Sequence, residues 1–216
     1  MVLGGIFISA YLIGFSGAIM PGPMLGVAVD ESLNRGFKAG PLLVLGHGIL
    51  EFVLVSAMVL GLRDFFSNET VAGLIGLFGG AFLAWMGYGM IKSSINKSIS
   101  LSGQEAVKSG KRRNLVLTGA VVSIMNPFFI LWWASTGMEF IRQSYAIGLL
   151  GIMFFFIGHI LADLTWYSVV SSAFSKGKKL ISDRIYRWII LSLGIFILFF
   201  SVYFIKSGWS MLFGKA

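Results

Sequence analysis

Residues 39–62 read AGPLLVLGHGILEFVLVSAMVLGL, and only His47 and Glu51 interrupt this apolar run. About 20 consecutive apolar residues suffice for a helix to cross the hydrocarbon core of a bilayer. The run therefore predicts a transmembrane helix. His47 and Glu51 stand four residues apart, so they share one face of that helix. An ionised carboxylate at the bilayer centre costs roughly 3 kcal/mol or more, so we expect Glu51 to face the protein interior.

The composition of the whole chain indicates the same class of protein. Of the 216 residues 56% are hydrophobic and 12% are charged, whereas soluble domains carry about 25% charged residues. The mean hydropathy is +0.86. Long apolar runs recur and are continuous rather than alternating, which favours helices over a membrane barrel. We predict an all-α polytopic membrane protein with six transmembrane helices at approximately 4–28, 39–62, 70–91, 115–138, 145–173 and 187–206.

The basic residues predict how the chain is oriented in the membrane. The connections after the first, third and fifth predicted spans hold thirteen of the 17 lysines and arginines. By the positive-inside rule these connections are cytosolic and both termini lie outside. We therefore expect a multi-pass protein of the plasma membrane. The net charge of +8 follows from this distribution and does not indicate nucleic-acid binding, and the absence of cysteine excludes thiol redox chemistry.

The second half of the sequence resembles the first. Three stretches match in the same order: AIMPGP (18–23) with SIMNPF (123–128), GHGILEF (46–52) with GHILADL (158–164), and GLFGGAFLAWMGYGMIKS (76–93) with ILSLGIFILFFSVYFIKS (190–207). The matches indicate two three-helix repeats, residues 1–92 and 115–216, joined by a cytosolic basic linker at 93–114. Because each repeat has an odd number of spans, the second is inverted relative to the first. Inverted repeats are typical of secondary transporters, whose substrate sites lie near the bilayer midplane.

Two proline motifs predict breaks in the first helix of each repeat. Pro21, Gly22 and Pro23 lie inside the first predicted span, and Asn126 and Pro127 lie inside the fourth. Proline removes a backbone N–H and clashes with the preceding turn. A half-helix that restarts after such a break aims free N–H groups at an anion. We interpret the five residues as substrate-binding, and the alternative is a pair of simple helix kinks.

The repeat also doubles the pair of ionisable residues. His47 and Glu51 correspond to His159 and Asp163, again four residues apart on one helix face. Buried acids can exchange protons near neutral pH, and a neighbouring histidine can assist. We therefore interpret the four residues as a proton- or ion-coupling site. The alternative is a structural hydrogen bond that joins two helices. Trp166, just after Asp163, is a further candidate for binding the substrate.

The stretch GFSGAIMPGPMLGVAVDESLNRGFKAGPLLVLGHGILE (14–51) resembles the beginning of LysE-type translocators, which export amino acids and related solutes. The resemblance includes the Pro-Gly-Pro motif, the glycine-spaced region after it, an Asn-Pro in the fourth segment, and an acidic residue followed by aromatics in the fifth. It covers essentially the whole chain. The resemblance implies an amino acid as substrate and export as the direction of transport.

These observations predict a secondary transporter that exports an amino acid or a similar small zwitterion by proton antiport, with sodium coupling left open. A second hypothesis is a divalent metal cation exporter, because two histidines and two acids form a mixed nitrogen and oxygen ligand set. An intramembrane enzyme that uses a His–acid pair as a base is a third hypothesis, and a membrane scaffold with only structural ion pairs is a fourth. We do not expect an enzyme, since no nucleophile signature or HExxH motif is present. The expected partners are a small-molecule substrate and the lipid bilayer, without a cofactor or resident metal, and a homo-oligomer is left open.

Overall fold

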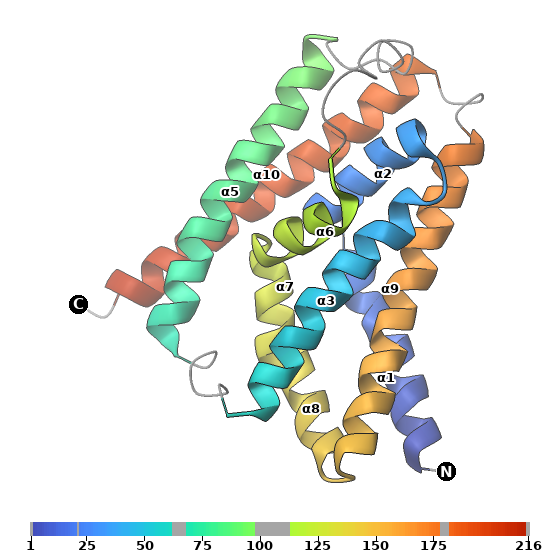
Figure 1. Ribbon diagram of the computed structural model, residues 1–216. Coiled ribbons are helices and arrows are strands. Elements are labelled where there is room, and N and C mark those ends of the chain that lie inside the picture. Colours follow the sequence, from blue (N-terminus) through green and yellow to red (C-terminus); the bar gives the residue numbers. More distant parts are fainter. Residues whose placement is uncertain (1, 21, 62–67, 98–112, 178–181, 215–216) are drawn as a thin grey trace.

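The computed structural model describes residues 2–20, 22–61, 68–97, 113–177 and 182–214, and this part of the chain is helical with short connections (Figure 1). Apolar runs of helical length explain this architecture, because a helix satisfies all its backbone hydrogen bonds within one segment. The helices are α1 (Val2–Ala18), α2 (Pro23–Arg35), α3 (Ala39–Val59), α5 (Glu69–Ile95), α6 (Leu115–Ile124), α7 (Pro127–Trp132), the π-helix η2 (Trp133–Gly137), α8 (Met138–Tyr145), α9 (Leu149–Gly177) and α10 (Asp183–Phe213).

The lengths of the helices agree with the predicted membrane class. Among the described residues α3, α5, α9 and α10 are each long and apolar enough to cross a bilayer, and α1 with α2 makes a fifth span if the two, inclined by 83°, are counted as one. The predicted fourth span, 115–138, is divided among α6, α7, η2 and the start of α8. Six complete spans therefore stay a prediction. Large apolar side chains cover the outside, such as Phe78, Trp85 and Phe199, which are 74%, 72% and 70% exposed.

Both predicted helix breaks are confirmed in the described residues. Gly22 has an extended backbone (φ −143°, ψ −174°) and stands at the N-cap of α2, which restarts at Pro23. Asn126 is extended as well and caps α7, its Oδ1 accepting a hydrogen bond from the backbone N–H of Phe128 at 3.1 Å. Proline suits the first position of a helix, where its missing N–H would have no intrahelical partner. Pro21 lies outside the described residues.

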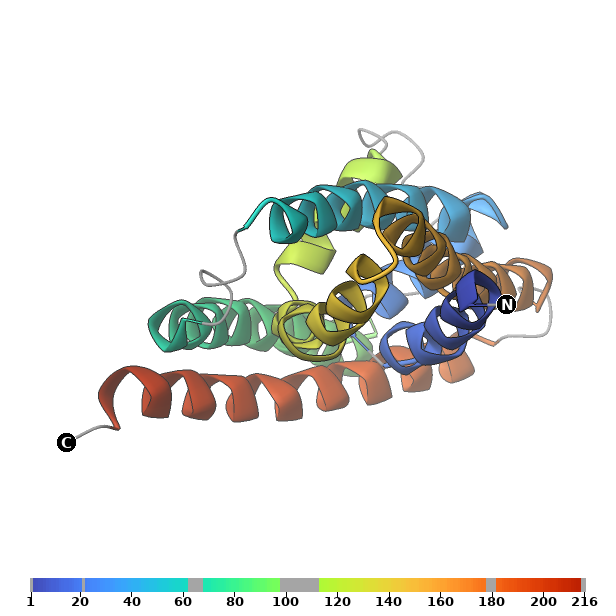
Figure 2. The ribbon, with the colours of Figure 1, turned by 90° about the horizontal axis from the view of Figure 1, so that it is seen from below.

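The most extensive helix contacts join the first half of the chain to the second. α5 packs along α10, α1 along α9, and α3 against α6. Figure 2 shows α5 and α10 side by side along one edge of the bundle. Glycine permits the close approach of α3 and α6, because a Cβ on Gly46 would collide with the backbone carbonyl of Val116. Gly76 and Gly208 allow the same closeness between α5 and α10, since a Cβ on Gly76 would lie 3.0 Å from the Cα of Gly208.

Polar contacts fix the C-terminal part of α2 to its neighbours. The hydroxyl of Tyr186 on α10 donates to Oδ1 of Asp30 at 2.7 Å, and the hydroxyl of Ser32 donates to Ser171 on α9 at 2.8 Å. Both contacts cross between distant parts of the chain. They hold α2 in a defined position, and with it the broken N-terminal end that faces the interior.

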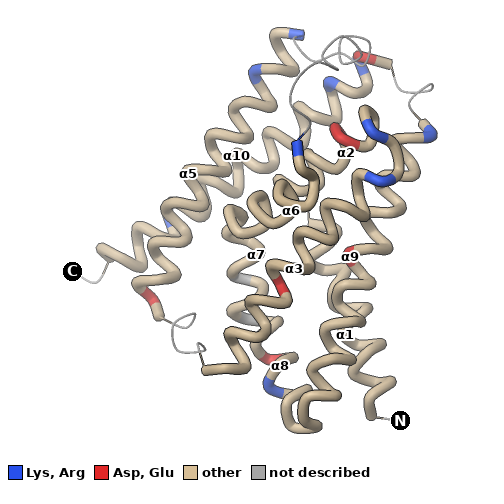
Figure 3. The backbone as a smooth tube through the Cα atoms, in the orientation of Figure 1, with Lys and Arg blue, Asp and Glu red and all other residues tan. Residues whose placement is uncertain are grey.

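The charged residues are unevenly distributed. Lysines and arginines gather at one end of the bundle, where α2 and α5 end and α10 begins (Figure 3). Acidic residues also lie in the middle of α3 and α9, far from both ends of these helices (Figure 3). Charges within apolar helices are costly and mark functional positions in membrane proteins. These central acids are the starting point for the site.

Candidate functional site

Four ionisable side chains from two helices meet inside the bundle. His47 and Glu51 lie one turn apart on α3, and His159 and Asp163 lie one turn apart on α9, so each pair shares a helix face. All four are buried, with exposed fractions of 1% for Glu51, 3% for His159 and Asp163, and 8% for His47. The two matching pairs of the sequence are therefore one cluster.

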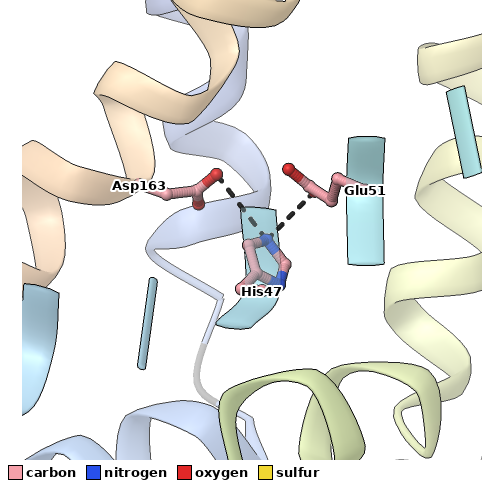
Figure 4. A group of neighbouring side chains, drawn as sticks. All are labelled: His47, Glu51 and Asp163. Carbon is pink, nitrogen blue, oxygen red and sulfur yellow. Dashed lines mark ion pairs between the residues drawn. The ribbon is translucent and has the colours of Figure 1, made fainter. Parts of the chain in front are cut away.

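The pairs are joined across the two helices as well as along them. Nε2 of His47 lies 3.0 Å from Oε1 of Glu51 and 3.7 Å from Oδ2 of Asp163. Nε2 of His159 lies 3.1 Å from the same Glu51 oxygen and 3.6 Å from the same Asp163 oxygen. Figure 4 shows the carboxyl groups of Glu51 and Asp163 on either side of one His47 nitrogen. Each imidazole thus lies between two carboxyl groups, an arrangement in which opposite charges compensate each other.

Trp133 supplies a third contact to Glu51. Its indole Nε1 donates to Oε1 at 2.9 Å, and its side chain is 1% exposed. An indole N–H only donates, so this oxygen acts as an acceptor. The neighbouring Trp132 stacks on His159 with ring centroids 4.7 Å apart. Both tryptophans flank the start of η2, and π-helical turns occur frequently at functional sites.

The surroundings of the two histidines differ. Nδ1 of His47 lies 2.7 Å from the hydroxyl of Ser123, which also contacts the carbonyl of Gly119 at 2.7 Å. Nδ1 of His159 is buried and has no hydrogen-bond partner among the described residues. In the sequence match between the repeats, Ala18 stands where the other half has Ser123. The loss of one hydroxyl thus makes two related positions chemically unequal.

Two carboxylate oxygens of the cluster have no hydrogen-bond partner within the described part of the chain. They are Oε2 of Glu51 and Oδ2 of Asp163, and both are buried. The two histidine nitrogens nearest to Oδ2 lie at 3.6 and 3.7 Å, beyond good hydrogen-bond geometry. A buried acceptor without a donor costs about 1–3 kcal/mol. The site therefore has spare capacity for a ligand that donates hydrogen bonds.

The cluster opens into a cavity of about 70 Å³. Gly22 and Asn126 line it, so both helix breaks reach the same space. The breaks also approach each other, because a Cβ on Gly22 would lie 3.3 Å from Nδ2 of Asn126. The rest of the wall is mainly aromatic and consists of Phe128, Phe129, Trp132, Trp133 and Tyr167, with Gly17, Ala18, Met20, Met24 and Ser123 between them.

Among the described residues, three other predicted substrate-binding residues do not line this cavity: Pro23, Pro127 and Trp166. Pro23 and Pro127 are fully buried behind it, and a Cβ on Gly79 of α5 would touch the ring of Pro127 at 3.0 Å. Trp166 does not line the cavity and packs against the hydrophobic core beside α2. The next residue, Tyr167, lines it instead. The predicted role of Trp166 as a lining residue thus lacks geometric support in this structure.

Sequence reasoning missed three side chains of the site. Trp132 and Trp133 look like packing or interfacial aromatics in the sequence, and Ser123 has no feature of its own. Their signal is position: Ser123 begins the stretch that matches the first helix break, and the tryptophans follow Asn126 within two turns. A search for polar and aromatic residues within two turns of each break would have found all three.

The cluster can attract two kinds of cation. Ligand atoms of His47, Glu51 and Asp163 lie within 4.8 Å of one another, and nitrogen with carboxylate oxygen suits divalent transition metals. The same carboxylates also suit an ammonium group, which presents three donors. The geometry alone accommodates either cation.

The chain is similar to known proteins over most of its length. The model of the family described as LysE type translocator matches residues 15–208. The chain is 28% identical to the chemotactic transduction protein ChpE of Pseudomonas aeruginosa, covering 74% of this chain and 78% of that protein. It is 25% identical to the threonine efflux protein of Escherichia coli K12 (79% and 82% covered) and 24% identical to the arginine exporter protein ArgO of Pectobacterium carotovorum (75% and 77% covered). No solved structure matches it.

Proposed function

This chain belongs to the LysE type translocator family, and from that premise we propose that it is a secondary transporter that exports an amino acid or a similar small zwitterion in exchange for protons. The family is one of multi-pass membrane transporters rather than enzymes. The amino-acid substrate is supported by relatives named as threonine and arginine exporters. The site must therefore bind an ammonium and a carboxylate at once and must couple their movement to an ion.

The observation that carries the proposal is the pair of unpartnered oxygens at the cavity. Oε2 of Glu51 and Oδ2 of Asp163 belong to different helices and lack donors among the described residues. An ammonium group placed between them would donate to both. Its positive charge would also be attracted to the two carboxylates, and the low dielectric constant of the protein interior strengthens this attraction. We assign the substrate ammonium to Glu51 and Asp163.

The helix breaks supply the complementary end. No side chain caps the N-terminus of α2, and its first residues Gly22 and Met24 line the cavity. A helix N-terminus carries free N–H groups and a positive partial charge, which favour an anion. Nδ2 of Asn126 lies beside Gly22 and adds a side-chain donor. We assign the substrate carboxylate to this end of the cavity.

The helix contacts support the two inverted repeats that the sequence predicts. α1 with α2 and α6 with α7 are broken at matching positions. α1 packs against α9, and α6 packs against α3, so each broken helix contacts the second helix of the other repeat. The third helices of the two repeats, α5 and α10, contact each other. In this proposal one repeat rocks against the other and opens the cavity to alternate sides. The basic end of the bundle faces the cytosol, with both termini outside.

Proton coupling follows from the chemistry of the cluster. A proton that binds to Glu51 or Asp163 removes the negative charge that holds the ammonium, and it occupies an oxygen that the ammonium would use. Proton and substrate therefore compete for the same acids, which is the requirement for antiport. His47 and His159 lie within 3.0–3.7 Å of the acids and can pass protons to and from them.

Transport by the purified protein in proteoliposomes tests this function. Amino acids are loaded inside, a pH gradient is imposed, and efflux is followed together with a trapped pH-sensitive dye. We expect amino-acid efflux coupled to proton uptake in the native protein. Glu51→Gln and Asp163→Asn should abolish the coupled flux. Glu139→Gln is the matched control, because Glu139 is an exposed acid paired with Arg142 at 2.6 Å, away from the cavity.

Each outcome of this experiment distinguishes between the hypotheses. Amino-acid flux with unchanged pH dependence in both acid variants would exclude the proton role and direct attention to sodium. Flux of divalent metals with no flux of amino acids would establish the metal exporter instead, with His47, Glu51 and Asp163 as ligands. Thermal unfolding of each variant in detergent shows whether a lost flux reflects a lost fold.

A further inference from the structure

We infer that the cavity selects small α-amino acids with uncharged side chains, from glycine to threonine in size, and that Phe128 sets the upper size limit. The inference rests on the proposed function and specifies its substrate class. It is carried by three separate observations, which concern the charges in the cavity, its volume and the way Phe128 is held.

The cavity offers two spare carboxylate oxygens, and the proposed function assigns both to a single ammonium group. The lining contains two carboxylates and two imidazoles and no other ionisable side chain within the described residues except the phenol of Tyr167. Each carboxylate already faces both histidines, and the two spare oxygens suffice for the α-ammonium. A lysine or arginine side chain would bring a second positive charge with no acid left to pair with it. A buried charge without a partner is strongly unfavourable.

The volume of the cavity in this conformation favours small side chains. A cavity of about 70 Å³ holds roughly five groups the size of a water molecule, at about 10–15 Å³ each. This is close to the size of alanine or serine. Leucine, methionine and arginine exceed it. Because protein interiors are closely packed, extra methylene groups can enter only if the wall moves.

Phe128 is a part of the wall that lines the site cavity and a neighbouring hollow at once. Its ring is held edge-on by Phe200 and Phe204 of α10, with centroids 5.1 and 5.5 Å away. It lines both the site cavity and a neighbouring hollow of about 10 Å³ that is bounded by Leu83, Ile197 and Phe200. Phe128 shares this position between the two spaces with Met20, Gly22 and Asn126, and it has the largest side chain of the four. Truncation of this side chain should merge them into a larger apolar pocket.

A counterflow assay in proteoliposomes tests the inference with alanine, serine, threonine, leucine and arginine as probes. We expect the native protein to exchange the three small amino acids at least tenfold faster than leucine, a ratio within the range of hydrophobic pockets, and not to exchange arginine. Phe128→Ala should raise leucine exchange about tenfold relative to alanine, and Phe128→Leu should give an intermediate ratio. The matched control is Phe78→Ala, because Phe78 is 74% exposed on α5.

The outcomes distinguish a failure of this inference from a failure of the proposed function. Absence of exchange for all five amino acids in the native protein would overturn the proposed function itself. Exchange of arginine or leucine as fast as alanine would leave amino-acid transport intact and overturn the selectivity. An unchanged ratio of leucine to alanine in both Phe128 variants, with native-like thermal unfolding, would remove Phe128 from the role of size limit.

Discussion

At the scale of single residues, the cluster combines two nearly equivalent pairs in unequal surroundings. Glu51 Oε1 receives contacts from both histidines and from Trp133, whereas Asp163 Oδ2 has no close donor. Glu51 is thus the more firmly held acid, and Asp163 is the one whose contacts a ligand can improve most. The donors around Glu51 are the first place to test this difference.

Replacement of Trp133 by phenylalanine keeps the packing and removes the donor to Glu51. We expect Trp133→Phe to lower the free energy of unfolding by about 1–3 kcal/mol, the usual cost of removing a partner from a buried polar group, and to reduce transport. Trp132→Phe is the control, because the Trp132 indole donates to Ser16 at 3.2 Å in a more exposed position. Thermal unfolding and proteoliposome efflux measure both effects. Equal losses in the two variants would contradict a special role for Trp133.

Ser123 supplies a hydroxyl to His47, and His159 has no such partner among the described residues. Two single substitutions can remove this hydroxyl from the second half and introduce one in the first. Ser123→Ala removes the partner of His47 Nδ1, and we expect a loss of about 1–3 kcal/mol in unfolding free energy with slower transport. Ala18→Ser places a hydroxyl at the cavity that His159 also lines, and if it reaches the unpartnered Nδ1 of His159 it should stabilise the protein by about 1 kcal/mol. Chemical denaturation of the two variants measures both changes. A stabilising Ser123→Ala would show that the contact with His47 is strained rather than favourable.

At the scale of helices, glycines decide how closely the elements approach. Gly46 lies next to His47, and its missing side chain lets α3 touch the backbone of α6 at Val116. A backbone carbonyl cannot move aside as the end of a flexible side chain can. The spacing of α3 and α6 therefore also sets the position of His47 relative to Ser123.

We expect Gly46→Ala to force α3 away from α6 and to destabilise the protein by about 1–3 kcal/mol or more, with transport largely lost. Gly89→Ala on α5 is the matched control, because a Cβ there meets nothing within 4 Å. Alanine favours a helix over glycine by about 1 kcal/mol, so the control should be neutral or slightly stabilising. Thermal unfolding in detergent compares the two. A neutral Gly46→Ala would mean that the two helices can separate without harm.

The sequence predicts the helices well where a long apolar run is sufficient evidence, as for α3, α5, α9 and α10. The breaks at Gly22 and Asn126 are also predictable, because proline acts locally on the backbone. The predicted span 115–138 is divided at Asn126, where the sequence predicts a break, and η2 then joins α7 to α8. Trp166 and Tyr167 are adjacent on α9, and the sequence does not specify the rotation of α9 that brings Tyr167 rather than Trp166 to the cavity. Neighbouring helix positions differ by about 100° around the axis, and contacts with α1 and α3 select which one faces the cavity.

At the scale of the whole molecule, the charged residues and the chain ends lie in a consistent arrangement. Lysines and arginines gather at one end of the bundle, and Figure 1 shows the N-terminus and the turn between α8 and α9 at the other. By the positive-inside rule we expect the basic end to lie in the cytosol. The absence of native cysteine allows this orientation to be tested with single introduced thiols.

Labelling of intact cells with a membrane-impermeant thiol reagent tests the orientation. Ala146→Cys, in the exposed turn between α8 and α9, should react from outside. Asn96→Cys, exposed at the end of α5, should react only after the cells are permeabilised. The cysteine-free native protein is the blank. The reverse pattern would invert the topology, and with it the sides to which the cavity opens.

The long helices α1, α3, α5, α9 and α10 pack mainly against the opposite half, which has a consequence for how the protein can be assembled. α5 with α10, α1 with α9 and α3 with α6 are all contacts between residues 2–97 and 113–214, so most of the buried surface of either fragment requires the other. Two separately synthesised fragments should therefore complement each other, each unstable when expressed alone and both restored on co-expression. The same interlocking explains how such a protein could arise from two chains of similar sequence, which would have formed a stable pair before their genes were fused.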